Sequence, residues 1–258
     1  MKEKKLSKSQ TDRIPKSGQH HTRKRSFNMK IKGLQKLTLL DYPGKVACTV
    51  FTGGCNFRCP FCHNASLVLD PASAGAIAPD AFFSFLKKRV GILDGVCITG
   101  GEPLIHEDID SFIAEIKALG YSVKLDTNGS FPDRLKSLVE RKLVDYVAMD
   151  IKNSKAKYAE TIGLSSFDLS KIEESVRFLL SGAIPYEFRT TVTREFHTAE
   201  SLVEAAKWII GCDRYFLQSF VNSGDLIDGG LTGYTKAEME ALADAVHPIL
   251  PAVALRGV

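Results

Sequence analysis

The chain has 258 residues, of which 44% are hydrophobic and 25% charged, with a formal net charge of +4 and a mean hydropathy of −0.05. These proportions are ordinary for a globular protein and exclude a fibrous or wholly disordered one. No apolar run approaches the roughly 20 residues that a membrane-spanning helix needs, and no apolar leader follows Met1. Six cysteines without a regular framework argue against a disulfide-stapled secreted protein, so we expect a cytoplasmic protein with no membrane partner.

The positive charge comes from residues 1–28, a polar stretch without apolar periodicity. It holds nine Lys or Arg and two acidic residues, so the rest of the chain has 25 basic and 28 acidic residues and a net charge of −3. This composition predicts a disordered basic extension at 1–28, followed by one domain over 29–258. A basic arm can bind nucleic acid, but we favour the alternative that 1–28 is dispensable.

From Lys30 onward, short β-branched or apolar runs alternate with segments that have helical spacing of apolar residues. The runs predict strands at 46–52, 96–99, 122–126, 144–151, 186–193 and 215–220. The intervening segments predict helices at 81–90, 109–119, 134–142, 169–180, 199–210 and 236–247. This alternation is typical of an α/β protein with right-handed βαβ units and a parallel sheet, either doubly wound or barrel-like.

Glycine and polar residues follow each predicted strand at its carboxyl end. They occupy positions 53–55, 100–102, 126–129, 149–152, 189–193 and 218–222. In parallel α/β folds the loops at the carboxyl ends of the strands converge on one face of the molecule. We therefore expect a single large functional site on that face.

Three cysteines, Cys55, Cys59 and Cys62, stand within eight positions in a C-x3-C-x2-C pattern. A loop this short can bring three sulfurs around one small inorganic group. Three thiolates suit a 4Fe–4S cluster with one iron left open, whereas structural zinc usually takes four protein ligands. His63 directly follows the third cysteine and is badly placed to be a fourth ligand. We predict an iron–sulfur cluster, with a zinc knuckle or chance clustering as the alternative.

This spacing, with Phe61 just before the third cysteine, resembles the signature of the radical S-adenosylmethionine (SAM) superfamily. Gly100-Gly101-Glu102-Pro103 resembles the superfamily's segment for the methionyl amino group of SAM, although alone it could be a turn before a helix. The resemblance implies an incomplete (β/α)6 TIM-like barrel that holds one 4Fe–4S cluster and SAM. In such enzymes an electron from the reduced cluster cleaves SAM, giving methionine and a 5′-deoxyadenosyl radical, while the protein orients the reactants and excludes water.

Four further segments resemble the activating enzymes of glycyl radical enzymes, most of all those of anaerobic ribonucleoside-triphosphate reductase. They are 39–45, 62–64, 125–129 and 149–152. The resemblance implies removal of the α-hydrogen from a glycine of a partner, with anaerobic ribonucleotide reductase as the leading candidate. It also implies a flavodoxin or ferredoxin-type electron donor. The residues it assigns to the cofactor are Phe61, Asn64, Gly100, Gly101, Glu102, Asp126, Thr127, Asn128 and Asp150.

The same group associates its Asp-Thr and Met-Asp segments with a monovalent cation beside the cofactor carboxylate. The residues that match here are Asp126, Thr127, Met149 and Asp150. Electrostatics agrees, because Asp126 and Asp150 end neighbouring strands and would repel each other without a cation or an ammonium between them. Without the resemblance, both could equally be solvated or cap the following loops.

Two basic residues at strand ends are candidates for catalytic contacts. Lys152 lies two positions after Asp150, on the same strand face, and could reach the cofactor or a substrate peptide. Arg189 could pair with the cofactor carboxylate. The alternatives are a surface lysine and an ordinary strand-end salt bridge.

The remaining cysteines and histidines carry no site pattern. Cys48, Cys97 and Cys212 are expected to be buried free thiols, and no second cluster fits between the cysteine loop and Gly100. His106, His197 and His247 are expected to be surface or capping residues.

Two alternative functions remain open. One is a radical SAM enzyme for a small molecule, similar to 7-carboxy-7-deazaguanine synthase, although that family typically has Asp-Thr where this chain has His63-Asn64. The other is a noncatalytic metal-binding module. The segment 217–222 lacks the late histidine of pyruvate formate-lyase activase, and its role is left unassigned.

Overall fold

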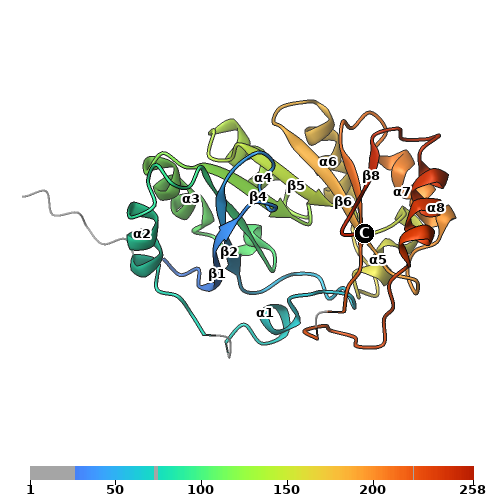
Figure 1. Ribbon diagram of the computed structural model, residues 1–258, viewed down its shortest axis with the longest axis horizontal. Helices are drawn as coiled ribbons and strands as arrows, with labels where there is room; N and C mark the ends of the chain where they lie inside the picture. The colour runs from blue at the N-terminus through green and yellow to red at the C-terminus, as the bar shows by residue number, and fades with distance from the viewer. Residues whose placement is uncertain (1–26, 73–74, 223) are drawn as a thin grey trace, which may run out of the picture.

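The computed structural model of this protein describes residues 27–72, 75–222 and 224–258. Its framework is an eight-stranded sheet whose strands lie side by side in chain order (Figure 1). Within the described residues the two edge strands do not pair with each other, so the barrel stays open. The strands are β1 (Ile31–Thr38), β2 (Ala47–Thr52), β3 (Gly95–Gly100), β4 (Ser122–Thr127), β5 (Tyr146–Asp150), β6 (Tyr186–Val192), β7 (Tyr215–Ser219) and β8 (Val253–Arg256).

All six predicted strands are present, and the structure adds one at each edge. β1 pairs antiparallel with β2, and β3 to β8 continue the sheet in parallel. The prediction misses β8 because it has only four residues, and β1 because it carries glycine and lysine residues, which are uncommon in strands but suit a sheet edge. The predicted α/β incomplete barrel is confirmed, with seven parallel strands rather than six.

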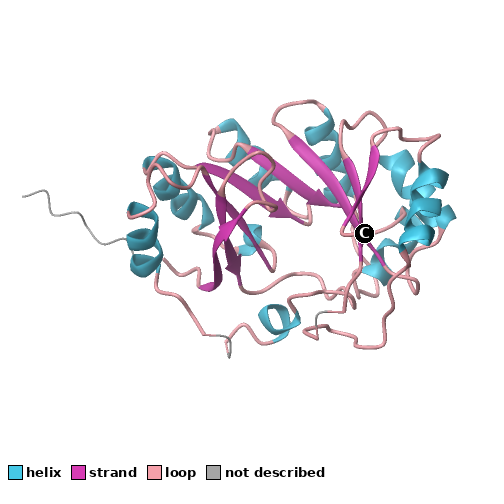
Figure 2. Ribbon diagram, in the orientation of Figure 1, coloured by secondary structure: helices cyan, strands magenta, loops and turns pink. Residues whose placement is uncertain are grey.

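The six predicted helices are also present and lie on the outer side of the sheet (Figure 2). Local capping explains where they begin: Thr198 and Thr235 each form a capping box, and proline opens two others. The prediction misses the short helices α1 (Ala65–Leu69) and α5 (Tyr158–Thr161), which lie in loops. The six are α2 (Pro79–Lys87), α3 (Ile109–Ala118), α4 (Pro132–Glu140), α6 (Ser170–Leu180), α7 (Ala199–Trp208) and α8 (Lys236–Val246).

The two faces of the sheet have different chemistry. Residues that face the helices are apolar and fully buried, such as Val96 and Ile98 on β3 and Val147 on β5. Each such side chain contributes roughly 1.5–3 kcal/mol when it is fully buried. Alternate positions, among them Lys124 and Glu187, are buried on the opposite, concave face. Charged residues in a parallel sheet are expensive to bury, so this face is where a function is expected.

The amino end of the concave face is closed by the segment 39–45. The ring of Tyr42 is 2% exposed and lies 6.1 Å from the ring of Tyr146, in a small cluster with Ala47 and Cys97. The hydroxyl of Thr49 donates to Asp41 at 2.5 Å and holds the segment in place. This segment therefore has a structural role at the end of the barrel opposite the predicted site.

The folded body begins earlier than Met29. Phe27 packs against Phe83 and Phe112, with ring centroids 5.9 and 5.6 Å apart, and the backbone N–H of Asn28 donates to Asp108 at 2.5 Å. Phe27 and Asn28, which the sequence places in the extension, therefore contact the folded domain, because Phe27 completes an aromatic cluster. The rest of the predicted extension, residues 1–26, lies outside the described residues.

Predictions for the other cysteines are confirmed, and those for the histidines are confirmed in part. Cys48, Cys97 and Cys212 are buried free thiols, and His247 follows the last turn of α8. No helix in the described part of the chain is both long and apolar enough to cross a membrane.

Candidate active site

The cysteine loop leaves β2 and packs backbone against backbone on the loop after β3. The N–H of Glu102 donates to the carbonyl oxygen of Gly54 at 2.9 Å. A Cβ atom on Gly101 would lie 1.8 Å from that same oxygen, and one on Gly100 would lie 2.4 Å from backbone atoms of Thr52. Only glycine fits at these two positions. The Gly-Gly pair is thus required to bring the two loops together.

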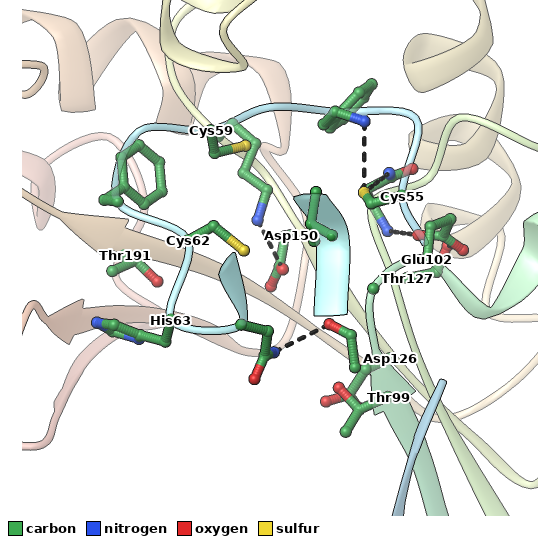
Figure 3. Close-up of a pocket in the computed structure, with 18 of the residues that line it drawn as sticks. Cys55, Cys59, Cys62, His63, Thr99, Glu102, Asp126, Thr127, Asp150 and Thr191 are labelled. Atoms are coloured by element: carbon green, nitrogen blue, oxygen red, sulfur yellow. Dashed lines mark hydrogen bonds and ion pairs between the residues drawn. The ribbon is translucent and has the colours of Figure 1, made fainter. Parts of the chain in front are cut away.

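These loops open into one pocket with about 780 Å³ of empty space, part of it open solvent. Figure 3 shows the three cysteine sulfurs and the carboxylates of Asp126 and Asp150 around the same space. The pocket is lined by every predicted cofactor residue, together with Lys152 and Arg189: Cys55, Cys59, Phe61, Cys62, Asn64, Gly100, Gly101, Glu102, Asp126, Thr127, Asn128 and Asp150.

The three thiols of the cysteine loop line one pocket, as the ligands of a single cluster would. Burial raises the pKa of Cys55 to about 11 and that of Cys59 to about 12, and it also raises the pKa of Cys62. Metal binding would have to displace these thiol protons. Among the described residues, no three His, Cys, Asp or Glu side chains are arranged to hold one metal ion. A 4Fe–4S cluster makes a different demand, because the three thiolates would bind three different irons rather than one ion.

Hydrogen-bond donors already surround one of the sulfurs. The N–H of Phe57 donates to Cys55 Sγ at 3.3 Å, and the amide of Asn128 approaches it at 3.9 Å. The same amide donates to Asn56 at 2.9 Å, which ties the cysteine loop to the loop after β4. Hydrogen bonds to ligating sulfurs tune the reduction potential of iron–sulfur clusters.

Glu102 is buried beneath the pocket and is 1% exposed. Its Oε1 accepts from the N–H of Leu104 (3.0 Å) and the hydroxyl of Thr127 (2.9 Å), and its Oε2 accepts from the N–H of Asn128 (2.6 Å). Burial raises its pKa to about 7 despite these hydrogen bonds. The contact predicted between Glu102 and the ammonium of SAM stays a prediction; in the structure the carboxyl group joins the ends of β3 and β4.

Asn64 and Met149 are both predicted site residues, but only Asn64 faces the pocket. The amide of Asn64 donates to the carbonyl oxygen of Gly100 at 3.0 Å, so it faces the pocket as predicted. The side chain of Met149 is fully buried in the core between the sheet and the helices. It points away from the pocket because it alternates with Asp150 along β5. The prediction that Met149 belongs to a cation site is therefore not supported by its side chain.

Asp126 and Asp150 end β4 and β5 as predicted, and a side chain lies between them. Arg189 on β6 donates from Nη1 to Asp126 Oδ2 and from Nε to Asp150 Oδ1, both at 3.0 Å. Lys124 donates to the other oxygen of Asp126, and Lys152 to the other oxygen of Asp150 at 2.9 Å. Burial alone would raise the pKa of Asp150, but Arg189 and Lys152 lower it to about 2.

Sequence reasoning misses two members of this site. Lys124 was not singled out, although its spacing of two residues from Asp126 places both on one strand face. His197 was predicted to be a surface or capping residue, and this is wrong, because its side chain is 0% exposed. A signal was available for His197, since it lies in the loop after a predicted strand, on the face where the site was expected.

His197 connects three parts of the site. Its Nδ1 accepts from the N–H of Thr193 at 3.2 Å, so Nε2 carries the proton and donates to the carbonyl oxygen of Lys152 at 2.8 Å. Its ring lies 5.9 Å from that of Phe61 in the cysteine loop. Burial lowers the pKa of His197 to about 4, so the ring is neutral near pH 7. His197 thus fixes the backbone at Lys152 relative to the cysteine loop.

The segment after β7 also reaches the pocket wall. Phe220 is buried, and its ring stacks on that of His63, with centroids 5.3 Å apart. His63 lines the pocket next to the third cysteine. This contact gives the segment 217–222 a structural place that its sequence did not indicate.

Comparison with known proteins identifies the class. A family model described as the Radical SAM superfamily matches residues 49–209, more than half of the chain. The chain therefore belongs to the radical SAM superfamily and is an enzyme of this type, for which a 4Fe–4S cluster and SAM are the implied cofactors. Its pocket is lined by the three thiols of the cysteine loop and by the Gly-Gly-Glu segment.

Within the superfamily, the chain is similar to enzymes that activate glycyl radical enzymes. It is 33% identical over 196 residues to a protein of Methanocaldococcus jannaschii with the provisional name glycyl-radical enzyme activating enzyme, which spans 74% of this chain and 79% of the relative. A pyruvate formate-lyase-activating enzyme of Listeria monocytogenes is 29% identical over 134 residues, which cover 48% of this chain and 53% of that enzyme. A 7-carboxy-7-deazaguanine synthase of Halobacterium salinarum is 36% identical over 95 residues, which cover 35% of this chain and 36% of that protein.

A solved structure supports the fold. The crystal structure of Streptococcus suis SuiB bound to precursor peptide SuiA matches with a TM-score of 0.63 at 18% identity, over 79% of this chain and 47% of that one. At this level of identity the likeness concerns the fold alone. It agrees with the open radical SAM barrel predicted from the sequence.

Proposed function

We propose that this protein installs a glycyl radical on a partner enzyme, with anaerobic ribonucleotide reductase as the leading partner. The observation that carries the proposal is the pocket in which the thiols of the C-x3-C-x2-C loop face the strand-end residues that match this group. The similarity to a glycyl-radical enzyme activating enzyme over most of both chains supports the same function.

The residues around the pocket have distinct proposed roles. Cys55, Cys59 and Cys62 hold the 4Fe–4S cluster. Gly100 and Gly101 let the backbone approach the methionyl end of SAM, with Phe61 and Asn64 beside it. Lys152 and Arg189 supply positive charge for the carboxylate of SAM or for the substrate peptide. Glu102 keeps Thr127 and Asn128 in position behind them.

The chemistry itself is a transfer of one hydrogen atom. When bound and reduced, the cluster supplies the electron that splits SAM into methionine and a 5′-deoxyadenosyl radical. The α C–H bond of the glycine then breaks, a C–H bond forms on 5′-deoxyadenosine, and the unpaired electron remains on the glycine. The protein needs no general base for this step, because its task is to hold the two carbons close together and exclude water. A flavodoxin or ferredoxin-type protein is the proposed electron donor.

The open barrel offers a route for the partner's glycine loop. Within the described residues β1 and β8 do not pair, so the sheet is not closed into a complete barrel. A peptide loop that enters there would reach the carboxyl ends of the strands. Because free thiols persist best under reducing conditions, we propose the cytoplasm as the compartment.

The test is anaerobic reconstitution with iron and sulfide, followed by reduction in the presence of SAM. We expect about four irons per chain, production of 5′-deoxyadenosine, and a glycyl radical signal in electron spin resonance when the reductase partner is added. Cys59→Ala should lose iron and SAM cleavage. The matched control is Cys212→Ala, which removes a buried thiol far along the chain from the cysteine loop and should retain both. Zinc without iron in the anaerobic sample would contradict the proposal.

A second candidate function is synthesis of 7-carboxy-7-deazaguanine, supported by the 36% identity over 95 residues. Against it stands His63-Asn64 after the third cysteine, where that family typically has Asp-Thr. The same reconstituted enzyme decides between them. A glycyl radical on the partner supports activation, and formation of 7-carboxy-7-deazaguanine without such a radical supports the alternative.

A further inference from the structure

Asp126 and Asp150 use all four of their carboxylate oxygens on cationic side chains. Asp126 accepts from Lys124 through Oδ1 and from Arg189 through Oδ2 (3.0 Å). Asp150 accepts from Arg189 through Oδ1 (3.0 Å) and from Lys152 through Oδ2 (2.9 Å). One planar guanidinium therefore spans the two carboxylates that the sequence assigned to a monovalent cation.

The two carboxylates and the three cationic side chains that contact them carry a formal charge of +1. Glu187, the nearby buried carboxylate on the same face, is already paired with Arg256. The group is poorly solvated, since the side chains of Lys124 and Arg189 are only 2% and 12% exposed. An added Na⁺ or K⁺ would raise the charge to +2 and would find every carboxylate oxygen engaged. Burying such an unbalanced charge is costly.

The other predicted cation ligands do not change this result. The hydroxyl of Thr127 donates to Glu102 at 2.9 Å and accepts from the N–H of Gly129 at 3.1 Å, so it too is engaged. The side chain of Met149 lies in the core on the other face of β5. The residues present do not fit a further monovalent ion.

We infer that the guanidinium of Arg189 takes the place of the monovalent cation, so that this protein binds SAM without Na⁺ or K⁺. A guanidinium keeps its charge at any physiological pH and its fork matches carboxylates, which lets it bridge Asp126 and Asp150 as an ion would. A further carboxylate beside this group would offset its formal charge of +1. The methionyl end of SAM carries such a carboxylate. The inference rests on the proposed function to the extent that SAM is the ligand.

The test measures the affinity of the cluster-loaded, oxidised protein for SAM, by calorimetry without reductant so that no turnover occurs. The buffer contains the chloride of Na⁺, K⁺ or tetramethylammonium at equal ionic strength, because tetramethylammonium is too large to enter between two carboxylates. We expect the Kd of the wild type to change by less than about twofold among the three salts. A linked ion would change it by about fivefold or more, the usual lower end of coupling between two ligands.

The variant Arg189→Ala removes the proposed substitute. We expect weaker SAM binding in every salt, and at least about fivefold tighter binding in Na⁺ or K⁺ than in tetramethylammonium, because an ion can now enter between Asp126 and Asp150. The matched control is Arg177→Ala, an exposed arginine on α6, which should remain insensitive to the cation. If Arg189→Ala does not take up the cluster, Arg189→Gln replaces it, because glutamine also removes the charge while it keeps a polar side chain, and the same three salts are compared.

Three results are informative. Loss of SAM affinity by the wild type in tetramethylammonium would overturn the inference while leaving the proposed function intact. Absence of SAM binding in every salt would instead count against the proposed function. An Arg189→Ala variant that binds SAM equally in all three salts would overturn the idea that the guanidinium fills an ion's place.

Discussion

The two ends of the concave face are built from the same strands but have different chemistry. β5 begins with Tyr146 and ends with Asp150, which lie on the same face about 13 Å apart. At the amino end, Tyr146 packs with Tyr42, Ala47 and Cys97, and its hydroxyl donates to the buried carboxylate of Glu187 at 3.1 Å. At the carboxyl end, Asp150 faces a pocket and is held by two cationic side chains.

This difference separates stability from function along one strand. An apolar cluster is stabilised by burial and depends little on exact geometry, so it can cover one end of the open barrel. The charged end loses free energy by desolvation and recovers it only through well-directed hydrogen bonds. We therefore expect substitutions at the amino end to change the free energy of unfolding, and substitutions at the carboxyl end to change cofactor binding. The predictions below test this division.

The largest effect is expected for Gly101→Ala. Its new Cβ would lie 1.8 Å from the carbonyl oxygen of Gly54, a backbone atom that cannot rotate away. We expect a loss of more than about 3 kcal/mol in the free energy of unfolding, poor iron incorporation, and SAM cleavage slowed by about 100-fold or more, because the cysteine loop is displaced. Chemical denaturation, iron analysis and 5′-deoxyadenosine assays measure the three.

The control for this substitution is Gly229→Ala. Nothing lies within 4 Å of a Cβ at Gly229, and its φ is not in the left-handed region. We expect its free energy of unfolding to stay within about 0.5 kcal/mol of the wild type. Normal cluster content in Gly101→Ala would show that the two loops do not need their backbone contact.

The second prediction concerns the apolar end. Tyr42→Ala should lower the free energy of unfolding by about 3–5 kcal/mol, because it leaves a cavity between Tyr146 and Cys97. The folded protein should still take up its cluster and bind SAM within about twofold of the wild type, as judged by calorimetry, because no pocket residue is touched. Tyr42→Phe keeps the ring and should cost only about 1 kcal/mol. A stable Tyr42→Ala variant that cannot bind SAM would contradict the expectation that the amino end affects stability and not cofactor binding.

The sequence predicts features that are local in the chain better than contacts between distant strands. Cys55, Cys59 and Cys62 lie in one short loop, and the Gly-Gly-Glu segment is contiguous, so their spacing alone indicates their place. The six inner strands follow from their apolar runs. The edge strands β1 and β8 do not, because an edge strand needs little apolar character and β8 has four residues.

Contacts across strands depend on register, which a single sequence does not contain. Arg189 lies opposite Asp150 in the pairing of β5 with β6, and this register decides that its guanidinium spans two carboxylates. The sequence predicts a positive charge between Asp126 and Asp150, and it gives a strand-end salt bridge only as the alternative for Arg189. In the structure that salt bridge provides the charge. The prediction for His197 fails for the same reason, since its partners, Thr193 and the carbonyl of Lys152, lie in the loops that follow two different strands.

The smallest expected effect concerns the pH dependence of the free energy of unfolding, to which Glu102 and His197 contribute with opposite signs. Burial raises the pKa of Glu102 from 4.5 to about 7, so between these values the folded state binds more protons than the unfolded state and stability falls as pH rises. Burial lowers the pKa of His197 from 6.5 to about 4, so between these values the folded state binds fewer protons and stability rises with pH. The two windows overlap from pH 4.5 to 6.5.

In that overlap the two contributions have opposite signs, and each amounts to at most about 1.4 kcal/mol per pH unit. We expect the contributions of Glu102 and His197 to offset each other in the wild type. Relative to the wild type, Glu102→Gln should lose more stability as pH falls, because the opposing contribution of Glu102 is removed. His197→Asn should gain stability relative to the wild type as pH falls, because the contribution of His197 is removed. Urea denaturation of the three proteins at several pH values measures the slopes. Equal slopes in both variants would show that these carboxyl and imidazole groups titrate normally, and would remove the strongest sign that the carboxyl end of the barrel is a desolvated site.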